Sequence, residues 1–166
     1  MARWFLDTEF NEDGRTIELI SIALVSSDCM RRYYAVSSEF NPDACNDFVK
    51  QHVLPNLGNT QPKTRKQIAA DVLALLRDDK SKPEIWGYFA DYDWVVFCQL
   101  FGRMVDLPDG FPMYCLDLKQ LMHMLGVKKD QLPQQVDADK HNALNDAEWI
   151  QLATKVLQTR METVKC

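Results

Sequence analysis

Residues 2–26, ARWFLDTEFNEDGRTIELISIALVS, contain the two segments that decide the fold. The first, residues 2–8, alternates like a strand, and the long apolar run at 17–26 predicts a second strand. A third strand is expected at 31–37. Short turns containing Gly14 and Asp28 separate the three segments. Because such short connections join neighbouring strands of opposite direction, we expect antiparallel pairing.

Alternating helices and strands follow these three strands. Asn41 and Pro42 are a typical helix cap and first residue, and Gly126 is a typical helix stop. The patterns predict helices at about 41–53, 64–77, 91–104, 117–125 and 142–164, strands at 84–90 and 114–116, and a long polar loop at 127–140. A loop of that length is usually functional. The order predicts an α/β fold in which helices flank a mixed sheet.

The composition is that of a soluble globular domain, with 46% hydrophobic and 26% charged residues among 166. No repeat or linker divides the sequence, so we expect one domain over residues 1–166. No apolar run approaches the roughly 20 residues that span a bilayer. The five cysteines form no Cys-x-x-Cys pair. We therefore expect a cytoplasmic protein without a membrane partner.

The net charge of −5 argues against a protein that coats nucleic acid by electrostatic attraction. It is compatible with a nuclease, because divalent cations neutralise acidic residues in such a site and can also hold a phosphate.

Asp7 and Glu9 lie two residues apart near the end of the first predicted strand. Side chains at that spacing share one face of a strand, so the two carboxylates converge. Their charges repel unless a cation lies between them, and oxygen ligands select Mg²⁺ or Mn²⁺. For an isolated Asp-x-Glu, however, an exposed strand end is the commoner explanation.

His141 and Asp146 lie near the start of the last predicted helix. Five residues on one helix would turn them about 140° apart, so we place His141 in the preceding loop and Asp146 on the first turns. A loop histidine can approach a substrate and withdraw, and its neutral form can take a proton from water. Ala143 and Ala147 give this helix a small face for close packing. His52 and His123 are interpreted as structural.

Taken together, these motifs resemble a known family. DTEF at 7–10, an aspartate on a central helix and HNALNDA at 141–147 resemble the DEDDh 3′-5′ exonucleases, a branch of the RNase H-like superfamily. DTEFNEDGRTIELISIALV, residues 7–25, is especially similar to the small mycobacterial and phage exoribonucleases of the polyadenylate-specific type. The resemblance covers roughly residues 3–157.

The central aspartate departs most from the family pattern, Asn-x-x-Phe-Asp. Phe89 stands at the asparagine, Tyr92 at the phenylalanine and Asp93 at the aspartate. We prefer Asp93 because an aromatic residue precedes it and the apolar stripe of the helix begins after it. Asp91 is the alternative, and either aspartate can also be a helix cap.

The resemblance implies two-metal hydrolysis of phosphodiester bonds with release of nucleoside 5′-monophosphates. Asp7, Glu9 and Asp146 would surround one Mg²⁺ or Mn²⁺ ion. Asp7 would bridge to a second ion, which Asp93 holds through water. His141 would be the general base. Substrate contacts are expected from Thr8, Phe10 and Trp94, with the two aromatic residues as stacking faces or, equally, core residues.

Single-stranded RNA or a short 3′ overhang is the expected substrate. The same site acting on DNA is one alternative, because no motif here reports discrimination of the ribose 2′-OH. A catalytically silent nucleic-acid-binding module on this scaffold is another. The resemblance also implies a possible homodimer.

Overall fold

The computed structural model describes residues 2–78, 81–136 and 140–164. Within these ranges five strands form one sheet in the order β3-β2-β1-β4-β5. The strands are β1 (Ala2–Glu12), β2 (Ile17–Ser26), β3 (Arg32–Val36), β4 (Pro83–Gly87) and β5 (Leu116–Asp117). β1, β2 and β3 pair antiparallel, whereas β4 runs parallel to both β1 and β5. The predicted mixed sheet is confirmed.

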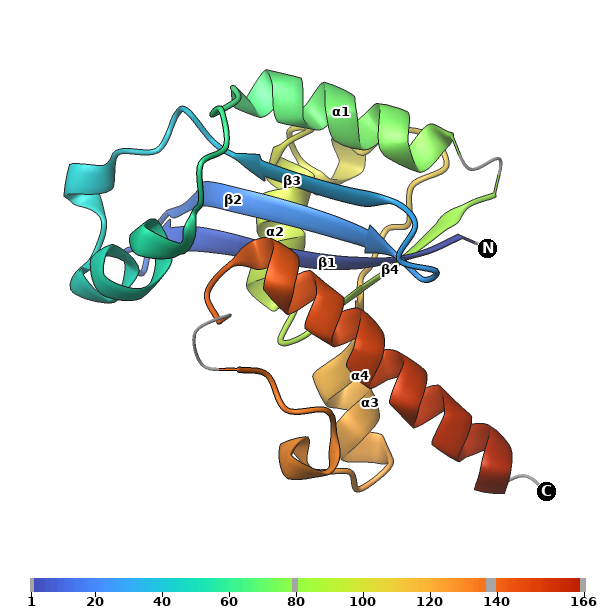
Figure 1. Cartoon of the computed structure of the whole chain (residues 1–166). Helices are drawn as coiled ribbons and strands as arrows, with labels where there is room; N and C mark the ends of the chain where they lie inside the picture. The colour runs from blue at the N-terminus through green and yellow to red at the C-terminus, as the bar shows by residue number, and fades with distance from the viewer. Residues whose placement is uncertain (1, 79–80, 137–139, 165–166) are drawn as a thin grey trace.

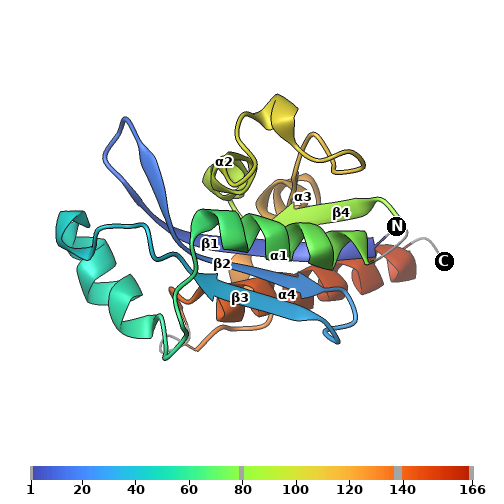
Figure 2. The same cartoon turned by 90° about the horizontal axis from the view of Figure 1, so that it is seen from above.

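Helices cover both faces of this sheet (Figures 1 and 2). They are α1 (Arg65–Arg77), α2 (Asp91–Gln99), α3 (Leu118–Met124) and α4 (Ala143–Val164). Trp4 and Leu6 of β1 belong to the hydrophobic cluster that contains residues of α1 and α2. Phe5 belongs to the cluster of α3 and α4. Because side chains alternate along a strand, the odd-numbered positions of β1 face α4.

Local hydrogen bonds explain where the helices begin. Thr64 caps α1 in a capping box with Gln67, and Asp117 caps α3 by accepting from the backbone N–H of Gln120. Gly126, with φ 65°, follows α3. This glycine is the predicted stop, since the left-handed conformation costs a glycine little.

The prediction of one continuous helix at 41–53 was wrong. The segment is broken into a 3₁₀ turn η1 (Pro42–Ala44), a π-helical turn η2 (Val49–Val53) and a 3₁₀ turn η3 (Leu54–Asn56). Asn41 caps η1 as expected. The break follows from Asn46, whose backbone N–H donates to Asn11 Oδ1 and whose side chain accepts from the backbone N–H of Val49. This side chain therefore starts a new turn.

Other boundaries differ by a few residues. β1 continues beyond residue 8, and β4 ends before residue 90. The helix expected over 91–104 ends at Gln99. Beyond it, Gly102 has φ 118° and Arg103 pairs with Asp106 in a separate 3₁₀ turn, so the chain leaves the helix axis.

The junction between β4 and α2 is tightly built. A Cβ on Gly87 would lie 2.6 Å from the Cβ of Ala90, so glycine is needed at this approach. Phe89 has a left-handed backbone with φ 55°, and the Ala90 backbone N–H donates to Asp117 Oδ2 at 2.7 Å. Pairing of β4 with β1 reaches only Phe5. The sharp turn thus lets the start of α2 cover the β1 edge that β4 leaves free.

No helix among the described residues is both long and apolar enough to cross a membrane. In the same part of the chain Cys29, Cys45, Cys98 and Cys115 form no disulfide.

Candidate active site

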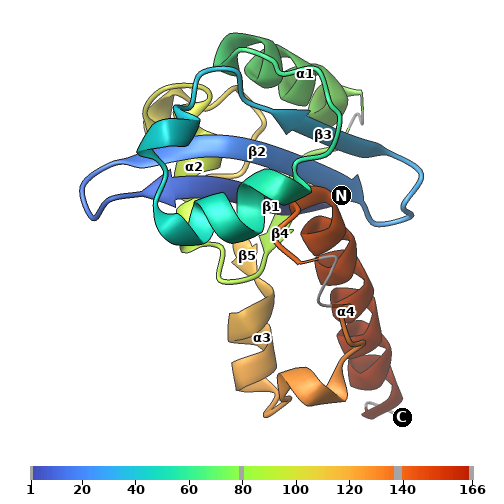
Figure 3. The ribbon, with the colours of Figure 1, turned by 60° about the vertical axis from the view of Figure 1, so that its left-hand side comes forward.

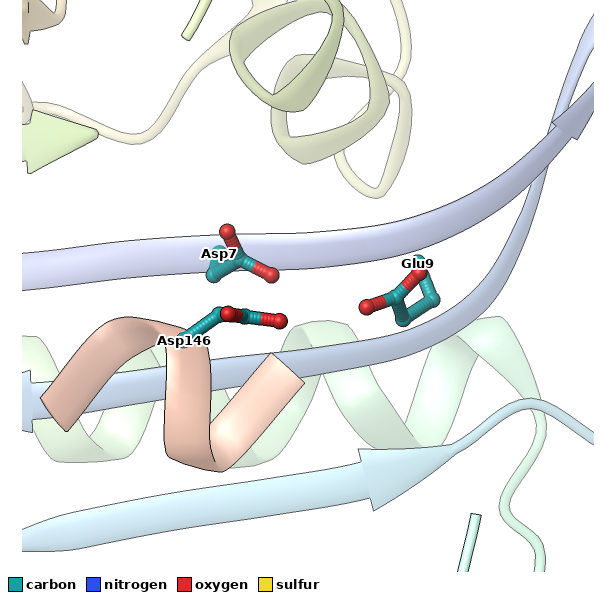
Figure 4. A group of neighbouring side chains, drawn as sticks. All are labelled: Asp7, Glu9 and Asp146. Atoms are coloured by element: carbon teal, nitrogen blue, oxygen red, sulfur yellow. The ribbon is translucent and has the colours of Figure 1, made fainter. Parts of the chain in front are cut away.

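Three carboxylates meet between β1 and α4 (Figure 4). Asp7 and Glu9 extend from the face of β1 that looks toward α4, and Asp146 comes from the first turns of that helix. One oxygen of each carboxylate lies within 4.8 Å of the others. Residues separated by most of the chain therefore share one small volume, as the motifs predicted.

Small side chains bring α4 close to the sheet at this point. Ala143 and Ala147 are fully buried and belong to one cluster with Ala23 and Val25 of β2. The pairing of β1 with β2 shifts register between Glu9 and Phe10. Irregularities of this kind bend a strand and re-aim its side chains, and they are frequent beside active sites.

Asp93 approaches the same place from α2. Its Oδ1 accepts hydrogen bonds from the backbone N–H of Thr8, at 2.8 Å, and from the Thr8 hydroxyl, at 2.5 Å. Asp93 is only 6% exposed, whereas Asp91 is exposed to solvent. Thr8, expected at the substrate, is itself buried and orients Asp93.

Burial and mutual repulsion raise the pKa values of these acids. Burial is the largest cause for Asp7, whose pKa lies well above its usual range, and the charges of Asp93, Asp146 and Glu9 add to it. Burial, then Asp146 and Asp93, raises the pKa of Glu9 to about 8. Burial raises the pKa of Asp93 to about 6 against the opposing hydrogen bonds from Thr8.

At this cluster the protein's own positive charge and hydrogen bonds therefore do not offset the effects of burial and of the neighbouring carboxylates on the pKa values. Burial also raises the pKa of Asp146, opposed by a hydrogen bond from Gln135 and by the charge of His141. Closely spaced carboxylates with raised pKa values are disfavoured in their ionised form unless a cation neutralises them. Their oxygens are the ligands that hard divalent cations bind. The cluster of Asp7, Glu9 and Asp146 is consistent with a metal site.

His141 precedes α4 in a left-handed conformation, with φ 60°. Its ring meets Phe48 edge to face, with centroids 5.1 Å apart, and lies 6.0 Å from the ring of His52. Sequence reasoning treated His52 as structural and gave no sign of this proximity. The Gln135 side-chain amide donates to Oδ1 of Asp146. The predicted functional loop thus reaches the site through a residue that no local pattern singled out; residues 137–139 of this loop lie outside the described ranges.

The two expected stacking residues occupy different surroundings. Phe10 stacks on Tyr92, with ring centroids 5.6 Å apart and ring planes at 16°. Phe10 directly follows Glu9 in the sequence, and Tyr92 directly precedes Asp93. Tyr92 is 55% exposed. Trp94 instead stacks on Phe97 at 5.1 Å and lines a pocket of about 240 Å³ that includes Tyr114. Tyr92 was not singled out as a substrate contact, although its place next to Asp93 was the available signal.

Comparison with known proteins supports the family predicted from the motifs. A family model described as the 3′-5′ exoribonuclease Rv2179c-like domain matches residues 2–158. The 3′-5′ exoribonuclease Rv2179c of Mycobacterium tuberculosis (strain ATCC 25618 / H37Rv) is 43% identical over 149 residues, which are 87% of this chain and 86% of the relative. The exoribonuclease MT2234.1 of strain CDC 1551 / Oshkosh matches equally well.

Solved structures show the same fold at low identity. The zinc-bound complex of E. coli exonuclease I with single-stranded DNA has a TM-score of 0.69 at 14% identity, covering 98% of this chain and 41% of the other. A 3′-exonuclease described as recognising a histone mRNA stem-loop has a TM-score of 0.56 at 16% identity, covering 95% of this chain and 64% of the other. This chain thus spans less than half of exonuclease I.

The exonuclease fold and the enzyme class, a 3′-5′ exoribonuclease and hence a hydrolase, are confirmed by these matches. The family model and the 43% identity both cover most of the chain. The chain belongs to the Rv2179c-like family of 3′-5′ exoribonuclease domains.

Proposed function

We propose that this domain removes nucleotides from the 3′ end of single-stranded RNA, or of a short 3′ overhang, by hydrolysis that releases nucleoside 5′-monophosphates. The observation that carries the proposal is the convergence of Asp7, Glu9 and Asp146 within 4.8 Å. His141 immediately precedes the helix that carries Asp146. Family membership supplies the reaction class.

The carboxylates would hold two divalent cations, Mg²⁺ or Mn²⁺, with Asp7 shared between them and Asp93 serving the second. Such ions supply charge neutralisation at the phosphate and make a bound water more acidic. Thr8 fixes one oxygen of Asp93 and leaves the other for ligation. His141 would accept the proton of the attacking water, a role that its position in a loop permits.

The substrate's terminal bases would stack on Phe10 and Tyr92. The two rings already stack on each other, Tyr92 is exposed and Phe10 is half-buried. Base stacking on aromatic rings tolerates any sequence. Trp94, the other expected stacking residue, lines a pocket on another side of α2 and is the alternative.

A ladder assay on end-labelled RNA, with Mg²⁺, Mn²⁺ or chelator, tests this proposal. Asp7→Asn, Asp93→Asn and Asp146→Asn should abolish metal-supported release of mononucleotides without unfolding the protein. His141→Ala should lower kcat by about 10²- to 10⁴-fold, the usual contribution of a general base. The matched control is Asp91→Asn, an exposed aspartate on the same turn as Asp93. Full activity of Asp146→Asn would refute the proposal.

Two rival functions predict different outcomes. Faster digestion of a matched DNA strand would make the enzyme an exodeoxyribonuclease with the same site. A catalytically silent binding module would bind RNA without cleaving it and would show weak or no heat on titration with Mn²⁺.

The family resemblance suggests a homodimer, which light scattering on the purified chain tests. We also propose that residues 1–166 act as one exonuclease domain.

A further inference from the structure

The broken segment at 42–56 lies beside the start of α4 (Figure 3). Two hydrogen bonds join the segment to the residues on either side of His141. The Asn56 side-chain amide donates to the carbonyl of Lys140 at 3.2 Å, and the Asn142 side-chain amide donates to the carbonyl of Asn56 at 2.7 Å.

Each asparagine also has a local partner that fixes it. Asn56 Nδ2 donates to the carbonyl of His52 at 2.8 Å, one turn earlier. Asn142 Oδ1 caps α4 by accepting from the backbone N–H groups of Leu144 and Asn145, at 3.1 and 3.3 Å. The two asparagines therefore connect the 140–142 turn to η3 and to the start of α4, two elements that are far apart in the sequence.

The turn between these bonds needs such support. A non-glycine residue with positive φ is disfavoured, and His141 has φ 60°. The rings of Phe48 and His52 lie beside the imidazole, with centroids 5.1 and 6.0 Å from its own, and both residues come from the same broken segment. Backbone and ring of His141 are thus both held from one side of the site.

We propose that Asn56, assisted by Asn142, is a positioning residue that holds His141 in the left-handed turn where the imidazole can reach the attacking water. This inference rests on the proposed role of His141. Asn56 touches no reacting atom; it acts by fixing the carbonyl of Lys140 and thereby the direction of the next side chain.

A double-mutant cycle between Asn56 and His141 tests the proposal. Asn56→Ala removes the amide donor but keeps the backbone carbonyl that Asn142 uses. It should lower kcat by about 10- to 100-fold with little change in KM, since small misplacements of a catalytic group have effects of that size. In the His141→Ala background the same substitution should change kcat by less than about twofold, because coupled residues are non-additive. Excess enzyme and Mn²⁺ keep the slow variants measurable.

Two further variants separate positioning from folding. Asn142→Ser keeps a capping oxygen for α4, but its shorter side chain lacks the amide group that donates to the Asn56 carbonyl. This variant should show the same dependence on His141. Asn59→Ala is the matched control, an exposed asparagine in the same region, and should leave kcat unchanged. Thermal unfolding monitored for every variant reports structural damage.

The outcomes are distinct. A loss that is equal in both backgrounds, or no loss at all, overturns the positioning role of Asn56 while leaving the general base intact. A His141→Ala variant with the wild-type rate overturns the proposed role of His141 itself.

Discussion

At the scale of single residues, the ionised Glu9 carboxylate is expected to destabilise the metal-free fold, although the proposed activity needs it. Its pKa of about 8 in the folded protein, raised mainly by burial, exceeds the ordinary 4.5. Folding therefore favours the protonated form. The stability gained from that proton is fully present below about pH 4.5 and is lost as the pH rises through about 8.

Glu9→Gln should therefore stabilise the metal-free protein at pH 8.5 by about 1–3 kcal/mol and have little effect at pH 5. The same variant should lose activity. Chemical denaturation in chelator at the two pH values measures the difference. Glu12→Gln, at the exposed end of the same strand, is the control. Equal stability of Glu9→Gln and wild type at pH 8.5 would show that repulsion and burial at Glu9 do not strain the site.

The aromatic pair of Phe10 and Tyr92 carries the second residue-scale prediction. Replacing either ring by alanine should raise KM for single-stranded RNA by roughly 5- to 100-fold, because stacking one base on an aromatic side chain is worth about 1–3 kcal/mol. Steady-state kinetics on a short oligonucleotide measure this change. Tyr114→Ala, in the pocket lined by Trp94, should leave KM unchanged. A larger effect at Tyr114 would move the strand to the Trp94 surface.

At the scale of elements, the start of α2 depends on the absence of a side chain at residue 87. Gly87→Ala would place a Cβ 2.6 Å from that of Ala90, so the helix must shift. We expect a loss of about 1–3 kcal/mol in the free energy of unfolding, as for other overpacked sites. Because α2 carries Asp93, kcat should fall as well.

The double variant Gly87→Ala/Ala90→Gly removes that Cβ contact and should recover most of the lost stability and rate. The next contacts of the new Cβ, at 3.5 Å, are ordinary. Urea denaturation and the ladder assay follow both quantities. Failure of Ala90→Gly to rescue the variant would place the damage elsewhere in the junction.

The elements also show which parts of the structure the sequence predicts. The strand at 2–8, which the structure extends to residue 12, and the strand at 17–26 follow from local alternation and an apolar run. The convergence of the Asp7 and Glu9 carboxylates follows from their spacing on one strand. The helix at 41–53 was predicted wrongly because its break depends on Asn11, 35 residues away from Asn46. The Asn56 contact with Lys140 likewise spans 84 residues, and Gln135 contacts Asp146 across a polar loop, 11 residues away. Periodicity reports which face is buried and says nothing of such partners.

At the scale of the whole molecule, the site joins three elements that have no local reason to meet. β1 supplies Asp7 and Glu9, α2 supplies Asp93 and α4 supplies Asp146. When these acids are ionised and no cation is bound, they repel one another. This repulsion lowers the free energy of unfolding of the metal-free protein. Binding of a divalent ion should reverse the sign of that contribution and couple metal affinity to global stability.

Mn²⁺ should therefore raise the melting temperature of the whole chain. At a concentration 100 times Kd the expected stabilisation is about 2.7 kcal/mol, which corresponds to roughly 5–10 °C for a protein of this size. The shift should grow between pH 6 and pH 8.5, because the raised pKa values of Asp7, Glu9 and Asp146 make protons compete with the ion. Calorimetric melting with Mn²⁺ or chelator measures it. Asp146→Asn should lose the shift and Asp91→Asn should keep it; a shift of equal size in both variants would place the bound ion outside this cluster.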